Sequence, residues 1–150
     1  MSKPFNAGEI MRELVEEIER DCGRNALRAL TAVVLATPVG NPTLWQSPPP
    51  PGYVGGHARR NWHVTSGSKS DAELPGVDGA GQLTIAQGMT VITAWERSGV
   101  RIGQPLHIQN AVPYIGRLND GWSTQAPSGF VEKAVLAING VTVDDGRREL

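Results

Sequence analysis

Apolar and charged residues alternate with helical spacing near the start of the chain. The apolar positions are Ile10, Met11, Leu14, Val15 and Ile18. Arginine and glutamate residues fill the positions between them, so one side of the segment is apolar and the other side is charged. Asn6 followed by Glu9 is a capping pattern, because the Asn side chain can accept a bond from the helix backbone. The pattern predicts an amphipathic helix that begins at about residue 7.

A second, nearly all-apolar segment runs from Asn25 to Thr37, with Arg28 as its one charge. Its composition predicts a buried helix. The triplet Asp21-Cys22-Gly23 stands between the two segments and predicts an interruption, because glycine weakens a helix. The leading region is therefore either two helices or one kinked helix. Pro38 predicts its end, since proline disfavours helical geometry in the residue before it.

The next segment, residues 37–56, reads TPVGNPTLWQSPPPPGYVGG. It holds six of the eleven prolines in the chain, four glycines and no charged residue. Proline lacks the amide hydrogen that helices and central strands need, so neither element can form along this segment. The composition predicts a long extended arm.

Two short segments alternate between apolar and polar residues and predict strands. They are residues Ala58–Ser66, which include Trp62, and residues Leu106–Asn110. The segment Gly67–Gly81 between them is polar, glycine-rich and aperiodic, which predicts a mobile loop.

Three further helices are predicted in the second half of the chain. The first is short and has an apolar residue at every third or fourth position. The second begins at a proline and stops at a glycine. The third begins at a serine cap. The residues that indicate them are Ile85, Met89, Ile92 and Trp95 for the first, Pro113, Tyr114 and Gly121 for the second, and Ser128, Phe130 and Ile138 for the third.

Together these elements predict one α+β domain. Helices at about 7–36 are followed by the extended arm at 37–56, by a sheet with helices at 57–139, and by a flexible tail at 140–150. The N-terminal helices and a C-terminal helix are expected to pack on a small antiparallel sheet.

The composition of the chain argues against several classes of function. The 150 residues include 14 Lys and Arg and 15 Asp and Glu, with no basic run, so a general affinity for nucleic-acid backbones is not expected. The single cysteine, Cys22, cannot form an internal disulfide, which favours a reducing compartment. No apolar signal core opens the chain and no apolar run is long enough to cross a bilayer, so we expect a soluble protein made in the cytoplasm.

Residues capable of chemistry form no catalytic or metal-binding pattern. The histidines lack the spacing of a metal site and are expected to be solvated or locally bonded. Glycines before two arginines resemble an anion-binding nest, but a turn that leads into a strand explains them as well. The clustered carboxylates are expected on a solvated helix face. We expect no enzyme, no cofactor and no metal. The residues considered are His57, His63, His107, Gly55, Gly56, Arg59, Arg60, Glu13, Glu16, Glu17 and Glu19.

Large aromatic residues lie in or beside the Pro/Gly-rich connections rather than in periodic core patterns. Aromatics on irregular segments are typical anchors at protein interfaces, whereas Trp62, in a predicted strand, is expected in the core. The residues that we expect at an interface with another subunit or partner are Trp45, Pro49, Pro50, Tyr53, Tyr114 and Trp122.

Several of these features occur together in one known family. Thr37-Pro38-Val39-Gly40 follows the leading helical region, and GGHARRNWHV and PYIGRLNDGWSTQAPSGFVEKAV follow later. Over most of residues 26–137 the chain resembles the tailed-bacteriophage neck proteins of the head–tail connector and tail-completion family, which includes the minor tail protein Z type. The residues that match the later family signature are Asn110, Pro113, Tyr114, Leu118 and Gly121, and those that depart from it are Ala111, Ile115 and Asp120.

The resemblance implies a non-enzymatic virion protein. Such proteins form a ring, commonly a hexamer, at the joint between head and tail, where they complete the tail or connect it to the head. The implied partners are further copies of the chain, neighbouring neck and tail proteins such as a terminator, adaptor or stopper, and DNA passing through the lumen, but no membrane. Trp45 and Tyr53 would anchor the arm on a neighbouring subunit. The alternative is a monomeric adaptor whose Ser47–Pro51 segment binds an aromatic-lined groove of a partner domain.

Overall fold

The computed structural model describes residues 6–40, 48, 51, 54–98, 104–121 and 128–136, with the side chains of residues 135 and 136 left aside. Most of the predicted arm and all of the predicted tail therefore lie outside the described residues. The elements are α1 (Ala7–Ala36), α2 (His57–Arg60), β1 (His63–Ser66), α3 (Gln82–Arg97), β2 (Leu106–Gln109), α4 (Ile115–Asn119) and α5 (Phe130–Leu136).

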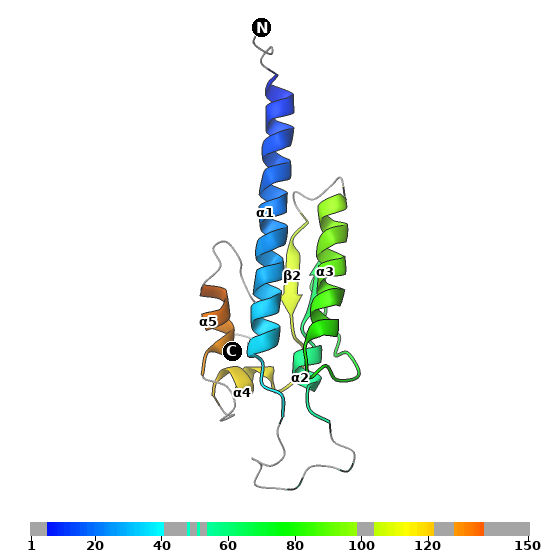
Figure 1. Ribbon diagram of the computed structural model, residues 1–150, viewed down its shortest axis with the longest axis vertical. Coiled ribbons are helices and arrows are strands. Elements are labelled where there is room, and N and C mark those ends of the chain that lie inside the picture. Colours follow the sequence, from blue (N-terminus) through cyan, green and yellow to red (C-terminus); the bar gives the residue numbers. More distant parts are fainter. Residues whose placement is uncertain are drawn as a thin grey trace.

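The long helix α1 forms the axis of the molecule (Figure 1). Helices α3 and α5 both pack against α1, and α3 runs in the opposite direction to it. Strands β1 and β2 pair antiparallel, with His63 opposite Gln109 and Ser66 opposite Leu106, and α3 packs against β1. Helices around a small antiparallel sheet confirm the α+β class expected from the sequence.

Helix α1 is continuous, so the predicted interruption at Asp21-Cys22-Gly23 is wrong. Asn6 caps its start as expected, since the Asn6 Oδ1 accepts a bond from the Glu9 amide at 3.2 Å. Gly23 is buried in the helix, and a Cβ at this position would overlap the Glu96 carboxyl group of α3. The glycine therefore leaves room for the Glu96 side chain of α3 and does not break α1.

The second half of α1 supplies the centre of the core. Ala29, Leu30, Val33 and Val34 are fully buried, as the apolar run predicted. Side chains from the other elements complete the core, and their buried members are Ala58, Trp62, Val64, Ile92, Ile108, Val112, Ile115, Phe130 and Val131.

The predicted strand at Ala58–Ser66 is correct only in its second half. Residues His57–Arg60 form the single turn α2, and the strand begins at His63. Gly56 precedes α2 with a φ of 111°, a conformation that glycine adopts without strain. Trp62 lies between the two elements and is 1% exposed, and its Nε1 donates to the buried Thr37 hydroxyl at 2.7 Å. This residue is a core residue, as expected.

The predicted serine cap of the last helix is wrong, because α5 begins at Phe130 rather than directly after Ser128. Asn119, at the end of α4, performs the capping instead. Its Oδ1 accepts a bond from the Val131 amide at 2.9 Å, and its Nδ2 donates to the Glu132 carboxylate at 2.9 Å. Gly121 lies just beyond α4 with a φ of 85°, so this glycine ends the helix as predicted.

The two ends of the segment that contains residues 41–53 lie next to each other. A Cβ at Gly55 would lie 2.6 Å from the backbone oxygen of Gly40 and 2.7 Å from a methyl group of Val39. The chain therefore leaves the body after α1 and returns to it before α2 at the same place.

Candidate interaction surface

The structure describes one of the six residues predicted at an interface. Tyr114 is 39% exposed and directly precedes α4. Trp45, Pro49, Pro50, Tyr53 and Trp122 lie outside the described residues. Their role as anchors stays a prediction.

A different surface is prominent among the described residues. The first half of α1 extends well past the ends of α3 and α5 (Figure 1). Four of its large apolar side chains are about half exposed, and we call them the α1 stripe: Ile10 at 48%, Met11 at 58%, Leu14 at 48% and Ile18 at 53%. They are the same residues whose spacing predicted the helix, and nothing in the described part of the chain covers them.

The α1 stripe does not continue the side of α1 that faces the core. Successive residues of a helix turn by roughly 100°, which follows from about 3.6 residues per turn. On this basis the stripe is centred near Leu14, whereas the buried side passes through Ala26 and Leu30, roughly a third to nearly half of a turn away. The stripe is therefore a second apolar face on the same helix.

Charge is distributed unevenly between the projecting half of α1 and the rest of the protein. Residues 7–22 carry six carboxylates and two arginines. The other described residues carry eight Lys and Arg against six Asp and Glu. The acidic cluster is not wholly solvated as expected, because Glu19 is 5% exposed on the core side of the helix.

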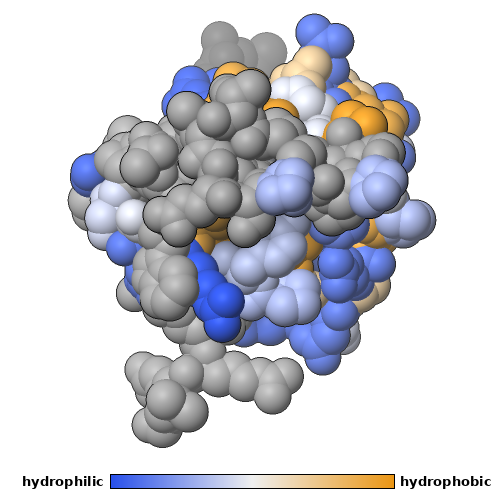
Figure 2. Space-filling model, turned by 90° about the horizontal axis from the view of Figure 1, so that it is seen from below, coloured by the Kyte–Doolittle hydropathy of each residue, from blue (hydrophilic) through white to orange (hydrophobic). Residues whose placement is uncertain are grey.

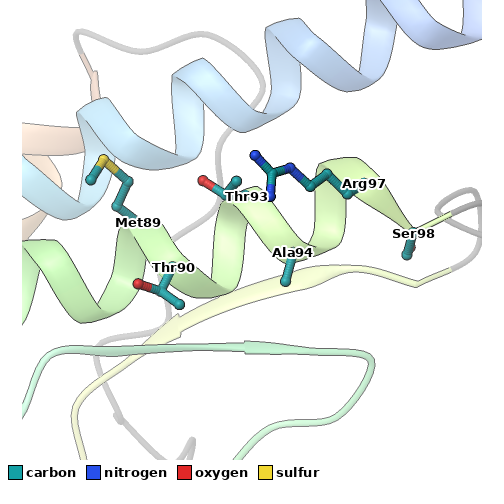
Figure 3. A pocket seen from close by; sticks show the side chains of 6 residues that line it. All are labelled: Met89, Thr90, Thr93, Ala94, Arg97 and Ser98. Atoms are coloured by element: carbon teal, nitrogen blue, oxygen red, sulfur yellow. The ribbon is translucent and has the colours of Figure 1, made fainter.

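A shallow groove of about 580 Å³ runs along α3. Its lining residues are Met89, Thr90, Thr93, Ala94, Arg97 and Ser98, and we call it the α3 groove. Figure 3 shows that Met89, Thr93 and Arg97 point to the side of α1. Met89 is 47% exposed, so an apolar side chain marks one end of the groove and a guanidinium group marks the other.

The lower end of the molecule differs from the α1 stripe. Seen from below, its described residues are largely hydrophilic, with apolar residues interspersed between them (Figure 2). Single exposed apolar residues are normal on a soluble protein, whereas a row of them on one helix face indicates a contact surface.

Arg59 is occupied within the fold and does not form an anion-binding nest. Its guanidinium donates to the Thr37 oxygen at 2.7 Å, the Leu35 oxygen at 3.2 Å and the Gly79 oxygen at 2.6 Å. Two of these acceptors lie at the C-terminal end of α1, whose last turn has no basic residue of its own. The cation therefore caps α1 and interacts favourably with its dipole.

His57 joins α2 to the loop at residues 67–81. Its Nε2 lies 2.7 Å from the Glu73 carboxylate, and its Nδ1 lies 2.7 Å from the Gly76 carbonyl oxygen. Both partners are acceptors, so both ring nitrogens carry a hydrogen when the two bonds are present together. These bonds, first to Glu73 and then to Gly76, raise the pKa of His57 above its usual value.

Further bonds hold the same loop, which argues against the predicted mobility. Asn61 accepts from the Leu74 amide at 2.6 Å and donates to the Leu74 oxygen at 3.0 Å. Asp78 accepts from the Gly81 amide at 3.0 Å and the Thr84 amide at 2.8 Å, so it caps α3. Burial acts to raise the pKa of Asp78, but the bonds from Thr84 and Gly81 outweigh it and lower the pKa.

Of the other two histidines, His63 is bonded locally, as expected, whereas the partner of His107 is 40 positions away in the chain. His63 Nδ1 lies 2.9 Å from the Asn61 oxygen, and His107 Nε2 lies 3.4 Å from the Gly67 oxygen. Among the described residues, no three His, Cys, Asp or Glu side chains are grouped so that they could hold a metal ion. No helix in this part of the chain is both long and apolar enough to span a membrane.

Sequence reasoning missed that the α1 stripe is exposed, although the signal was present. The angular offset between the apolar positions of residues 10–18 and those of residues 26–34 can be calculated from the sequence. Two offset apolar faces on one straight helix predict two different partners. The α3 groove had a weaker signal, because Met89 shares its helical spacing with Ile85 and Ile92, and Ile92 is buried.

The residues that match the later family signature lie in one stretch, from the end of β2 to Gly121 just beyond α4. Asn110 is 4% exposed; its Nδ2 donates to the Ala58 oxygen at 2.9 Å, and its Oδ1 accepts from the Val112 amide at 3.1 Å. Asn110 thus connects the end of β2 to α2 and fixes the turn that leads to Pro113 and Tyr114. No family model, curated protein or solved structure matches the chain, so the resemblance rests on these motifs alone.

Proposed function

We propose that the chain is a structural protein of a tailed-bacteriophage particle, which forms a homo-oligomeric ring at the head–tail joint. There it would complete the tail or connect it to the head. The sequence signature around Asn110–Gly121 supports the choice of family. The buried bonds of Asn110 give this part of the signature a structural role that needs no bound substrate.

The observation that carries the proposal is the projecting half of α1. An isolated helix of about 12 residues is marginally stable in water, so most helical stability comes from packing of an apolar face. The α1 stripe has no cover among the described residues, and it lies on a helix that extends past the body of the domain. A partner that buries this stripe would stabilise the helix, which is the behaviour expected of an assembly protein.

The polar residues support a structural role in a second way. His57, Arg59, Asn61 and Asp78 all bind backbone or side-chain groups of the same domain and join α1, α2, α3 and the loop at 67–81. Their bonds stabilise the joint between these elements. They do not converge on the α3 groove, whose lining contains Arg97 as its single charged residue among the described residues.

Purified phage particles provide the direct test. Mass spectrometry of particles encoded by the same genome is expected to find the chain in a few copies per particle, and gold-labelled antibody is expected to mark the neck. A phage that lacks the gene should produce filled heads and separate tails. The absence of the chain from intact particles, or normal joining without the gene, would contradict the proposal.

A variant of the α1 stripe makes this test specific. Leu14→Glu places a charge in the stripe and should fail to restore joining in a phage that lacks the gene. Arg12→Glu changes a charge on another side of the same helix and serves as the matched control, which is expected to restore joining. Circular dichroism of both purified variants shows whether each remains folded.

A further inference from the structure

We propose that the subunits contact one another head to tail: the α1 stripe of one copy lies in the α3 groove of the next copy. This inference rests on the proposed self-association and names its contact surfaces. The occupant of the groove is therefore a second copy of the same chain. The two surfaces lie at different places on the domain, so each copy can offer its stripe to one neighbour and its groove to the other.

The two surfaces have the same spacing along their helices. The apolar positions of the projecting half are residues 10, 11, 14, 15 and 18, and the main groove residues are 89, 90, 93, 94 and 97. Both sets follow rows four residues apart, which is the pattern that interdigitates when two helices pack at about 8–10 Å between axes. Small side chains at Thr90, Thr93 and Ala94 leave room for the larger Ile and Leu side chains of the stripe.

Charge favours the same pairing. Glu13 and Glu17 border the α1 stripe along one side, because they lie three positions after Ile10 and Leu14 respectively. The exposed Arg97 stands at the end of the α3 groove. The projecting half is acidic, whereas the remaining described residues have a small excess of basic groups. An acidic helix against a more basic body is a complementary pair, and the charges select partner and orientation.

Pairing of one stripe with another is less favourable for the same reason. Two antiparallel helices related by a two-fold axis at Leu14 would bring Glu13 and Glu17 of both copies to the same edge. Like charges placed in close contact disfavour such an interface. A contact between two different surfaces can repeat from copy to copy and closes into a ring when the rotation allows it.

Cross-linking between single cysteines tests this geometry. In a Cys22→Ser background, Leu14→Cys and Thr93→Cys are introduced together, and a short bismaleimide joins cysteines that lie close to one another. Stripe-in-groove contact predicts a ladder of covalent oligomers on a denaturing gel. Leu14→Cys alone and Thr93→Cys alone are the matched controls, and both are expected to stay monomeric on the gel.

Charge exchange provides a second and independent test. Arg97→Glu is expected to weaken self-association by about fivefold or more, as measured by light scattering over a concentration series. Adding Glu13→Lys and Glu17→Lys to this variant should restore most of the loss. Lys69→Glu changes an exposed basic residue outside the groove and is expected to have little effect.

The outcomes separate the inference from the proposed function. A chain that stays monomeric at all concentrations, and is absent from particles, contradicts both. Oligomers in which Leu14→Cys alone cross-links show stripe against stripe and overturn only the inference. If the protein forms oligomers but the double variant gives no ladder, the stripe does not lie in the groove. If the stripe cross-links only to another virion protein, its partner is not a second copy of the chain. Either result overturns the inference and leaves the virion role standing.

Discussion

Gly88 lies where α3 comes close to both α1 and β1, and replacing it with alanine tests the packing argument. The residue is buried in the middle of α3. A Cβ at this position would overlap the Leu30 Cδ2 and would lie 3.1 Å from the Val64 Cγ2. Leu30 is fully buried, so its side chain cannot move into solvent to make room.

Two effects of opposite sign act on Gly88→Ala. Alanine is a better helix former than glycine and would stabilise the fold by about 1 kcal/mol. Overpacking of a filled core costs about 1–3 kcal/mol, and an overlap against a fixed side chain belongs at the upper end of this range. We therefore expect a net loss of about 2 kcal/mol in the free energy of unfolding. For a chain of this length the midpoint of thermal unfolding falls by about 4–8 °C.

Urea denaturation followed by circular dichroism measures this change, and Gly116→Ala is the matched control. Gly116 lies in the helix α4, and a Cβ there would meet nothing within 4 Å. The control is therefore expected to be neutral or to stabilise by up to about 1 kcal/mol. Adding Leu30→Ala to Gly88→Ala should show a coupling of about 1 kcal/mol or more, because one change makes room for the other. Equal stabilisation by both glycine replacements would refute the packing argument.

The remaining predictions concern the polar bonds of the fold. The raised pKa of His57 means that its bonds to Glu73 and Gly76 stabilise the fold fully below the unfolded value of about 6.5. This stabilisation is lost as the pH rises through the pKa of His57 in the folded protein. NMR titration should show that Glu73→Gln lowers the pKa of His57. An unchanged pKa would contradict the bond between His57 and Glu73. Asp78→Ala should cost about 1 kcal/mol through the lost cap of α3, a loss that shrinks as the pH falls through the lowered pKa of Asp78. Thr37→Val should cost about 1–3 kcal/mol by leaving the buried Trp62 Nε1 without its acceptor, whereas Thr37→Ser keeps the bond; equal stability of the two variants would argue against that bond.

Local patterns in the sequence predicted the elements that depend only on residues close to them in the chain. Most of the large apolar side chains at residues 26–36 are buried, which followed from composition alone, whereas Leu35 is 53% exposed. The helix at α3 and the two strands also followed from their periods, and the antiparallel α+β arrangement is confirmed. Capping of α1 by Asn6 depends on residues three apart, and it too was predicted correctly.

Features that depend on distant residues were not predictable in this way. Gly23 was taken for a break because its neighbour on α3, Glu96, is far away in the sequence. The turn α2 was assigned to a strand because the bonds of Arg59 to the end of α1 join residues more than 20 positions apart. In the same way, Asn119 replaced Ser128 as the cap of α5 because α4 ends beside the start of that helix.

The candidate surface was predictable in part. The apolar positions of the α1 stripe were identified from their spacing, but the spacing alone does not say whether a face is covered by the same chain or by a partner. That distinction needs the position of the end of α3, which stops short of the projecting half of α1. The aromatic anchors chosen from the sequence were selected for their irregular surroundings, and Tyr114 is the one whose exposure is now described.

The close approach of Gly40 and Gly55 makes the segment between them an exchangeable part of the protein. Because both ends already meet, replacing residues 41–53 with a short glycine-containing turn changes the chain entropy of loop closure by only about 1 kcal/mol. Such a shortened chain should fold with the same core, since Arg59 of α2 bonds the end of α1 and α3 packs against α1. Related domains could therefore carry segments of different length here, and each could fit a different neighbour without any change to the body.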